Sequence, residues 1–276
     1  MKQHLFFSAL LLLFVAVIPS CKKDTTTVSY ETEQMIAEDI AAHNDLGEQS
    51  ELELDELIPN NLTGEGAEER NNCAVVTYAQ PKGTWPNTIT IDYGTGCTKA
   101  GVTFKGKIIV QQSAAMTQAG ATRTITYDQF FVESVQVSGN KIVTYTGLNA
   151  SGQPVFTRTG NETLTFPDGT KSTRALSHTR TMTQGYGTPA RADNVWTITI
   201  NDTGKNRQGN DYTVTSTTPL SRRDVCPWMS AGVLTFVNNG KTRSIDFGDG
   251  SCNREAVVTL ADGTQQTIKI RHHWWK

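Results

Sequence analysis

Residues 244–252 read SIDFGDGSC, and residues 90–97 read TIDYGTGC. Each segment places an apolar residue, an aspartate and an aromatic residue before a glycine turn and a cysteine. Alternating apolar positions that end in a glycine turn are typical of β-strands. Residues 90–97 and 244–252 are therefore two copies of one repeat. The repeat predicts a duplicated β framework without a catalytic signature.

The cysteines extend this repeat. Cys73 precedes Cys97, and Cys226 precedes Cys252, by nearly the same interval. An even number of cysteines after Cys21 in an exported chain normally forms disulfides, although four cysteines allow three connectivities. The repeat favours the pairs Cys73–Cys97 and Cys226–Cys252, because each disulfide then closes one copy. Free buried cysteines are the alternative.

Residues 73–276 predict an all-β body, an antiparallel meander of hairpins that forms a large twisted sheet or a sandwich. Threonine, valine and isoleucine alternate with polar residues between short glycine turns, as in residues 88–93. Asp-Gly at 168–169 is a strong hairpin signal. We expect two pseudo-repeated lobes, about 73–185 and 190–276, within one body, because no charged or proline-rich linker separates them.

The N-terminus predicts a signal peptide over residues 1–20. Lys2 precedes an apolar run, Leu5–Ile18, that is shorter than the roughly 20 residues of a membrane-spanning helix. Residues 18–21 read IPSC and are similar to a bacterial lipobox, which implies cleavage before Cys21 and its acylation with palmitate-type chains. An ordinary secretory signal that ends in cysteine is the alternative.

The next segment, residues 21–72, predicts a lipidated acidic tether. Residues 24–72 carry 14 acidic residues and one basic residue, a net charge of −13. A segment of low hydrophobicity and one-signed charge cannot offset its ordering entropy, so we expect it to be mostly disordered. A short helix over Glu31–His43 is the exception, because three apolar residues there lie on one side.

The body has the opposite charge. Residues 73–276 hold 21 Lys and Arg against 13 Asp and Glu, a net charge of +8. A positive body could attract an anionic glycan, lipopolysaccharide phosphates or its own tether, and a solvated surface is the simpler interpretation. We expect no nucleic-acid partner, since no nucleic-acid-binding motif is present and the chain carries an export signal.

Two further strings carry a resemblance. Residues 226–233 read CPWMSAGV, and CKKD follows the signal peptide at 21–24. Together with the Asp-aromatic-Gly segments, they resemble surface or periplasmic lipoproteins of the Bacteroidota type over most of the chain. The resemblance implies an envelope location and this architecture. It implies no activity, because none is established for that group.

Asp92 and Asp246 occupy matching repeat positions. A glycosidase needs two carboxyl groups about 5–9.5 Å apart across one bond, and pairing of the lobes could bring these two together. The stronger interpretation is that each accepts backbone N–H groups in its own turn. Asp246, Asp249 and Ser251 could offer oxygens to calcium, but the full ligand series is lacking. We expect no catalytic residue, no metal and no cofactor.

The most unusual predicted strand is Thr170–Thr183. In a regular strand Arg174, His178 and Arg180 share one face, where they could hold an anionic ligand. An exposed face whose arginines extend their charged ends into water is the alternative.

Four tryptophans could form a platform on which sugars stack, although core packing and edge protection explain them equally well. They are Trp85, Trp228, Trp274 and Trp275.

The leading hypothesis is a lipid-anchored protein of the cell envelope, attached to the outer membrane on its periplasmic or cell-surface face. Its role would be structural, or the binding of a glycan or an envelope protein. The rival hypothesis is a hydrolase of envelope polysaccharide that uses Asp92 and Asp246 as its paired carboxylates.

Overall fold

The computed structural model of the chain describes residues 25–58, 73–99, 101–188, 191–226 and 228–270. Within these ranges a long α-helix, α1 (Thr25–Leu57), precedes strands β1 to β14, and a single turn of 3₁₀ helix, Arg191–Asp193, precedes β9. No helix in the described ranges is long and apolar enough to cross a membrane.

The strands follow one another with short connections. Their bounds are β1 Val75–Tyr78, β2 Asn87–Asp92, β3 Cys97–Lys99, β4 Val102–Gln112, β5 Thr122–Val132, β6 Val135–Leu148, β7 Pro154–Thr165, β8 Lys171–Gln184, β9 Val195–Lys205, β10 Asp211–Arg223, β11 Ala231–Asn238, β12 Lys241–Asp249, β13 Glu255–Thr259 and β14 Gln265–Lys269.

All the strands form one antiparallel sheet, in the order β1-β2-β4 and then β5 to β14 in sequence, with β3 paired to β4. The prediction of an all-β antiparallel meander is confirmed. β8 and β9 pair directly, from Thr173 opposite Lys205 to Gln184 opposite Val195. The two expected lobes are therefore parts of one sheet.

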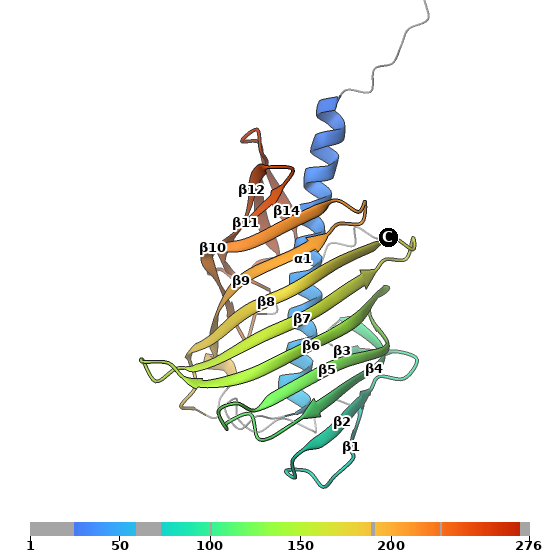
Figure 1. The fold of residues 1–276 in the computed structure, drawn as a ribbon, viewed down its shortest axis with the longest axis vertical. Coiled ribbons are helices and arrows are strands. Elements are labelled where there is room, and N and C mark those ends of the chain that lie inside the picture. Colours follow the sequence, from blue (N-terminus) through green and yellow to red (C-terminus); the bar gives the residue numbers. More distant parts are fainter. Residues whose placement is uncertain (1–24, 59–72, 100, 189–190, 227, 271–276) are drawn as a thin grey trace, which may run out of the picture.

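The sheet wraps around α1, which runs along its concave side (Figure 1). Ile36 and Ile40, in the N-terminal half of the helix, pack in one apolar cluster with residues of β9 to β14. Leu54 and Leu57, near its C-terminal end, pack in a second cluster with residues of β2 to β9. The first strands therefore lie beside the C-terminal end of α1, and the later strands lie beside its N-terminal half.

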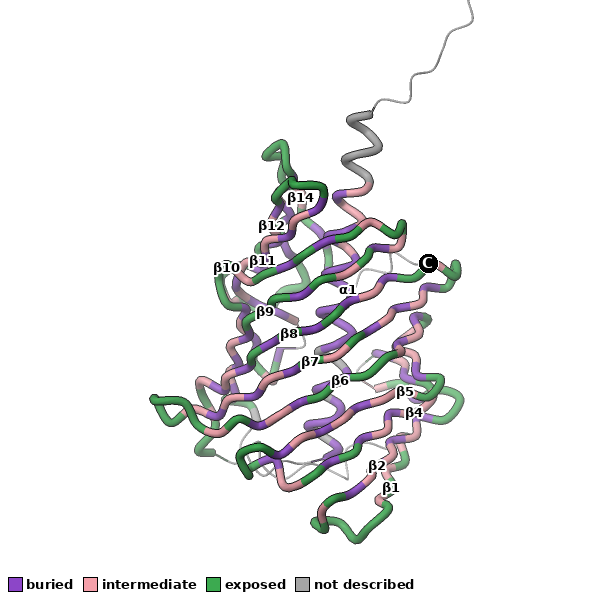
Figure 2. Tube along the Cα trace, in the orientation of Figure 1, coloured by how far each residue is buried: buried purple, intermediate pink, exposed green. Residues whose placement is uncertain are grey.

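Burial alternates along the strands and is unbroken in the middle of the helix (Figure 2). In β8 every second residue from Ser172 to Met182 is buried and faces α1, as the two-residue period of a strand requires. Residues 39–47 of α1 are all buried, so the sheet covers more than one side of the helix. The helix is the centre of the fold.

The expectation of a mostly disordered tether is wrong over residues 25–57. The short helix expected over Glu31–His43 is part of the much longer α1. The expectation considered the acidic segment alone, where charge opposes order. In the fold, apolar residues of α1 are buried and its carboxylates meet cations of the sheet, which together offset the ordering entropy. Residues 59–72 lie outside the described ranges.

Two glycines allow β6 and β7 to approach closely. Gly139 and Gly160 adopt positive φ angles of 110° and 145°. A Cβ atom on Gly139 would lie 2.1 Å from the carbonyl oxygen of Asn161, and one on Gly160 would lie 2.2 Å from that of Asn140. Only glycine fits these positions, and Gly160 lies directly opposite Lys141 of β6.

Both expected disulfides are present. Cys73 pairs with Cys97, and Cys226 pairs with Cys252, with Cα–Cα distances of 5.4 and 5.7 Å. Each disulfide closes one copy of the repeated segment, as the sequence predicts.

Candidate functional site

Many of the buried charged residues gather at the contact between α1 and the sheet. The helix carries the acids, and the inward positions of the strands and turns carry the bases. The partners run from β12 at the N-terminal end of α1 to β3 and β5 at its C-terminal end. In order along the helix, the pairs are Glu33–Arg243, Asp39–Arg207, Glu51–Lys141, Glu53–Lys99 and Asp55–Arg123.

Glu51 lies at the centre of this row of ion pairs between α1 and the sheet. Its carboxylate is 3.7 Å from Lys141 Nζ, 3.5 Å from Arg158 Nε and 3.9 Å from an Nη atom of Arg180. The next residue toward the N-terminus, Ser50, accepts a hydrogen bond from Lys141 Nζ at 3.0 Å. One buried carboxylate therefore faces three buried cations, and Lys141 also lies 3.5 Å from Glu162.

A second cluster joins β8, β9 and α1. Arg174 donates from Nε to Asp202 Oδ2 at 2.5 Å and from Nη1 to Asn44 Oδ1 at 2.7 Å. His178 Nε2 lies 2.8 Å from the same Asp202 oxygen, and the backbone N–H of Ser177 donates to the other oxygen. Burial alone would raise the pKa of Asp202, but Arg174 and the hydrogen bond from His178 outweigh it and lower this pKa to about 2.

His178 is held in its neutral form. Burial lowers its pKa, and this effect exceeds the opposite effect of Asp202. Since the Asp202 carboxylate only accepts, the ring hydrogen of His178 lies on Nε2. The cluster therefore consists of one carboxylate that bonds Arg174 and a neutral imidazole.

A third cluster has the hydrogen-bond order of a Ser–His–carboxylate triad. His43 Nδ1 lies 2.8 Å from Glu162 Oε1, and His43 Nε2 lies 3.1 Å from Ser172 Oγ. Ser172 Oγ is also 3.0 Å from the carbonyl oxygen of Lys205, to which it donates. Ser172 is 0% exposed, and His43 and Glu162 are each 2% exposed. No substrate can reach the serine, so this triad fastens α1 to β7 and β8.

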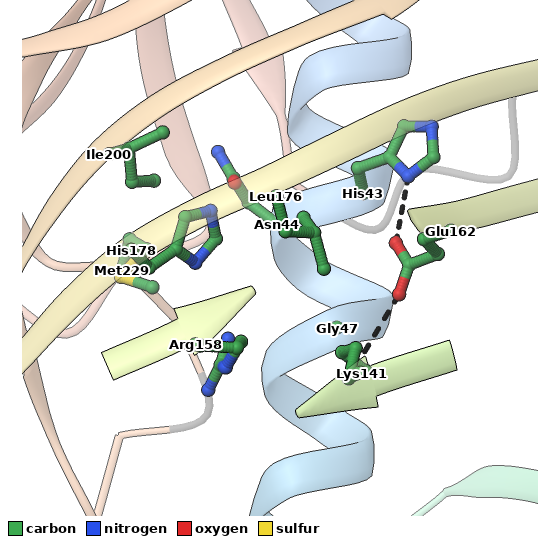
Figure 3. Close-up of a pocket in the computed structure, with 10 residues that line it drawn as sticks. All are labelled: His43, Asn44, Gly47, Lys141, Arg158, Glu162, Leu176, His178, Ile200 and Met229. Carbon is green, nitrogen blue, oxygen red and sulfur yellow. Dashed lines mark hydrogen bonds and ion pairs between the residues drawn. The ribbon is translucent and has the colours of Figure 1, made fainter. Parts of the chain in front are cut away.

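The void beside these clusters is small. Its volume is about 10 Å³, and its lining includes His43, Lys141, Glu162 and His178 (Figure 3). A cavity of this size is about that of a single water probe, far below the several hundred Å³ of a small-molecule site. This void is therefore too small to hold a ligand.

The residues predicted to hold an anionic ligand are all buried on the inner face of β8. Arg174, His178 and Arg180 are 2%, 6% and 4% exposed. Arg174 and His178 contact Asp202, and Arg180 contacts Glu51 and lies over the ring of Trp196. An external anionic ligand stays a prediction, and the chain's own carboxylates occupy these positions in the structure.

Sequence reasoning missed the residues that complete the network, namely His43, Glu51, Lys141, Glu162 and Asp202. One signal was available. The acidic segment and the basic body have opposite net charges, and Lys141, Arg158, Arg174 and Arg180 all occupy inward positions of their strands. Bases that repeat on the buried face of a sheet indicate an internal acidic partner.

Asp92 and Asp246 lie far apart in the sheet. Asp92 ends β2 and Asp246 lies on β12, with β4 to β11 between these strands. Each carboxylate accepts the backbone N–H two residues later, from Gly94 and Gly248, at 2.8 Å. The turn hydrogen bond is the same in both copies, as the repeat predicts, and the structure does not bring the two carboxylates together.

The described tryptophans are also separate. Trp85 packs against the cluster formed by β2 to β9, whereas Trp228 packs against the other cluster and beneath Arg254. Trp274 and Trp275 lie outside the described residues. Within the ranges that the structure describes, no group of three or more His, Cys, Asp or Glu residues could hold a metal ion.

A larger hollow lies on the outer face of the sheet. It is an open groove of about 720 Å³ over β7 to β11. Thr173, Thr203 and Thr213 line it from strand positions that alternate with buried residues, so they point away from α1. In contrast to the interior, this groove is accessible.

No family model, no curated protein and no solved structure matches this chain.

Proposed function

We propose that this protein is a lipid-anchored component of the cell envelope that has a structural or binding role. The observation that carries the proposal is the position of α1. The expected lipidated residue, Cys21, precedes the first residue of α1, Thr25, by four residues, and four extended residues span at most about 14 Å. Because α1 is the centre of the fold, the acyl chains would attach almost directly to the body.

The contacts of the first described side chains of α1 support one orientation at the membrane. Thr32 donates to Gln208 in the turn after β9, and Glu33 accepts from the N–H of Ala261 in the turn after β13. These turns therefore lie nearest the anchor. The strands at the other end of the sheet, β1 to β5, would face away from the membrane.

The chemistry of the interior supports binding or structure over catalysis. The Ser172–His43–Glu162 cluster is inaccessible, and Asp92 and Asp246 serve their own turns. No described contact favours the polysaccharide hydrolase. The outer face, with its groove, is where a partner has access.

The test is replacement of the lipidated residue. Cys21→Ala should remove palmitate labelling and move the protein from the membrane fraction to the soluble fraction. Ser8→Ala, a change of similar size within the apolar leader, should leave both readouts unchanged. Retention of Cys21→Ala in the membrane fraction after an alkaline wash would contradict lipid anchoring.

A further inference from the structure

The outer groove is built from rows of side chains that run across the strands. One row pairs Asn161 with Ala175, Ala175 with Thr203, Thr203 with Thr213, and Thr213 with Val237. Neighbouring strands lie about 4.8 Å apart, so this row extends for roughly 19 Å. A linear molecule of several units could lie along it.

A second row runs beside the first. Thr163 pairs with Thr173, Thr173 with Lys205, and Lys205 with Asp211. Lys205 Nζ is 2.5 Å from Asp211 Oδ1, and both side chains are exposed. The charges of Lys205 and Asp211 cancel, so these two rows offer hydrogen-bonding groups without a net charge.

The hydroxyl and amide groups of the groove are free to bind a ligand. Among the described residues, the side chains of Asn161, Thr173, Thr203 and Thr213 form no hydrogen bond within the protein, and their strand positions direct them outward. Ala175, Val237 and the threonine methyl groups supply small apolar patches between them. Hydroxyl and amide groups interspersed with small apolar surface suit a ligand that combines hydroxyl groups with C–H faces.

The volume of the groove suits a ligand of several units, and its charge disfavours an anionic one. Ligand sites usually measure about 300–1,000 Å³, and the groove lies within that range. An anionic ligand would gain little here, because both bases that line the groove already have acidic partners. Lys205 pairs with Asp211, and the buried Arg174 pairs with Asp202. A neutral, polyhydroxylated chain matches the groove better.

We infer that the outer groove over β7 to β11 binds a neutral oligosaccharide that lies across the strands. This inference rests on the proposed binding role in the envelope and names its site and ligand class. Recognition is by hydrogen bonds from hydroxyl and amide groups, with contacts from threonine methyl groups to the C–H faces of the sugars.

The experiment is titration calorimetry of the detergent-solubilised full chain. The probes are neutral hexasaccharides of β-linked glucose, α-linked glucose and β-linked xylose, with an oligogalacturonate of equal length as the anionic probe. At least one neutral hexasaccharide should bind, and the anionic probe should bind at least tenfold more weakly.

Valine replacements test the position of the site, because valine keeps the shape of threonine and removes its hydroxyl. Thr203→Val and Thr213→Val, which change a directly opposed pair in the groove, should each weaken binding roughly fivefold, as expected for one lost hydrogen bond. The matched control is Thr179→Val with Thr199→Val, an opposed pair on the same outer face that does not line the groove. This control pair should leave binding unchanged.

Three results would overturn the inference. They are no binding of any neutral hexasaccharide, equal or tighter binding of the anionic probe, and an equal loss of binding in the groove and control variants. Because the titration is performed in solution, it does not depend on the lipid anchor. Failure of this test and failure of the Cys21 test are therefore distinguishable.

Discussion

Single buried carboxylates make the stability of this protein depend on pH. Asp202 and Glu162 are almost completely buried, and each is bonded to a cation or a histidine of the interior. Burial raises the pKa of Glu162, but Lys141 and the hydrogen bond with His43 outweigh this effect and lower the pKa to about 2. Both carboxylates therefore stay ionised well below their usual range, which links folding to pH.

We predict that the free energy of unfolding falls as the pH falls from about 5 to 2. A carboxylate whose pKa is lower in the folded state contributes stability that is complete above its unfolded pKa and is lost as the pH falls through its folded pKa. For Asp202, with a pKa of about 2 against 3.8, this contribution is about 2 kcal/mol. His178, whose pKa burial lowers, adds a loss in the same direction below about pH 6.5. Urea unfolding at several pH values measures the slope.

The variant Asp202→Asn should reduce that slope and destabilise the protein at pH 7, since Arg174 loses its carboxylate. The control is Asp92→Asn, which changes an exposed turn carboxylate and should affect stability by less than about 1 kcal/mol. If the free energy of unfolding changed equally with pH in the wild type and in Asp202→Asn, the contribution assigned to Asp202 would be contradicted.

At the scale of elements, α1 and the sheet complete each other. The inward faces of the strands carry bases, and several of them, such as Arg123, Arg158 and Arg243, meet their acids on the helix. Glu51 shows this mutual dependence most clearly, because three cations from β6, β7 and β8 converge on it. Removal of one member of a buried charge cluster leaves the others uncompensated.

The predicted effect of Glu51→Gln is a loss of about 3–5 kcal/mol in the free energy of unfolding, typical of a buried ion pair that loses one partner. Chemical denaturation at pH 7 measures it. Glu38→Gln is the matched control on the same helix, because Glu38 is only half-buried and Arg207 keeps its bond to Asp39. The control should change stability by less than about 1 kcal/mol. Equal losses of unfolding free energy in both variants would show that the ion pairs of Glu51 do not stabilise the packing of the helix against the sheet.

The sequence predicts the strands well because alternation is a local signal. Residues 88–93 alternate, and Ile89 and Ile91 are buried on one side of β2 as expected. The disulfides follow from the repeat in the same way. The helix is different, since its order depends on bases more than a hundred residues away, as in the Asn44–Arg174 contact. No local window of sequence contains both partners, so the acidic segment alone predicts disorder.

The candidate site was predictable only in part. The alternation of β8 correctly groups Arg174, His178 and Arg180 on one face, but alternation does not tell which face is buried. That assignment needs the position of α1. The outer groove requires the curvature of five strands, β7 to β11, which no hairpin signal specifies.

At the scale of the whole molecule, the sheet winds along its helix from the C-terminal end to the N-terminal end (Figure 1). The N-terminal residues of α1 contact the turns after β9 and β13, near the expected lipid anchor. The lipid anchor that we propose at Cys21 would therefore lie at the end of the molecule where these two turns lie.

Amide hydrogen exchange of the full-length, detergent-solubilised protein tests this account most directly. If α1 is the centre of the fold, the amides of Ile36 to Leu46 exchange as slowly as those of β7 and β8, through the same cooperative unfolding. Exchange of these helix amides at the rate of an unstructured chain, while β7 and β8 stay protected, would contradict it.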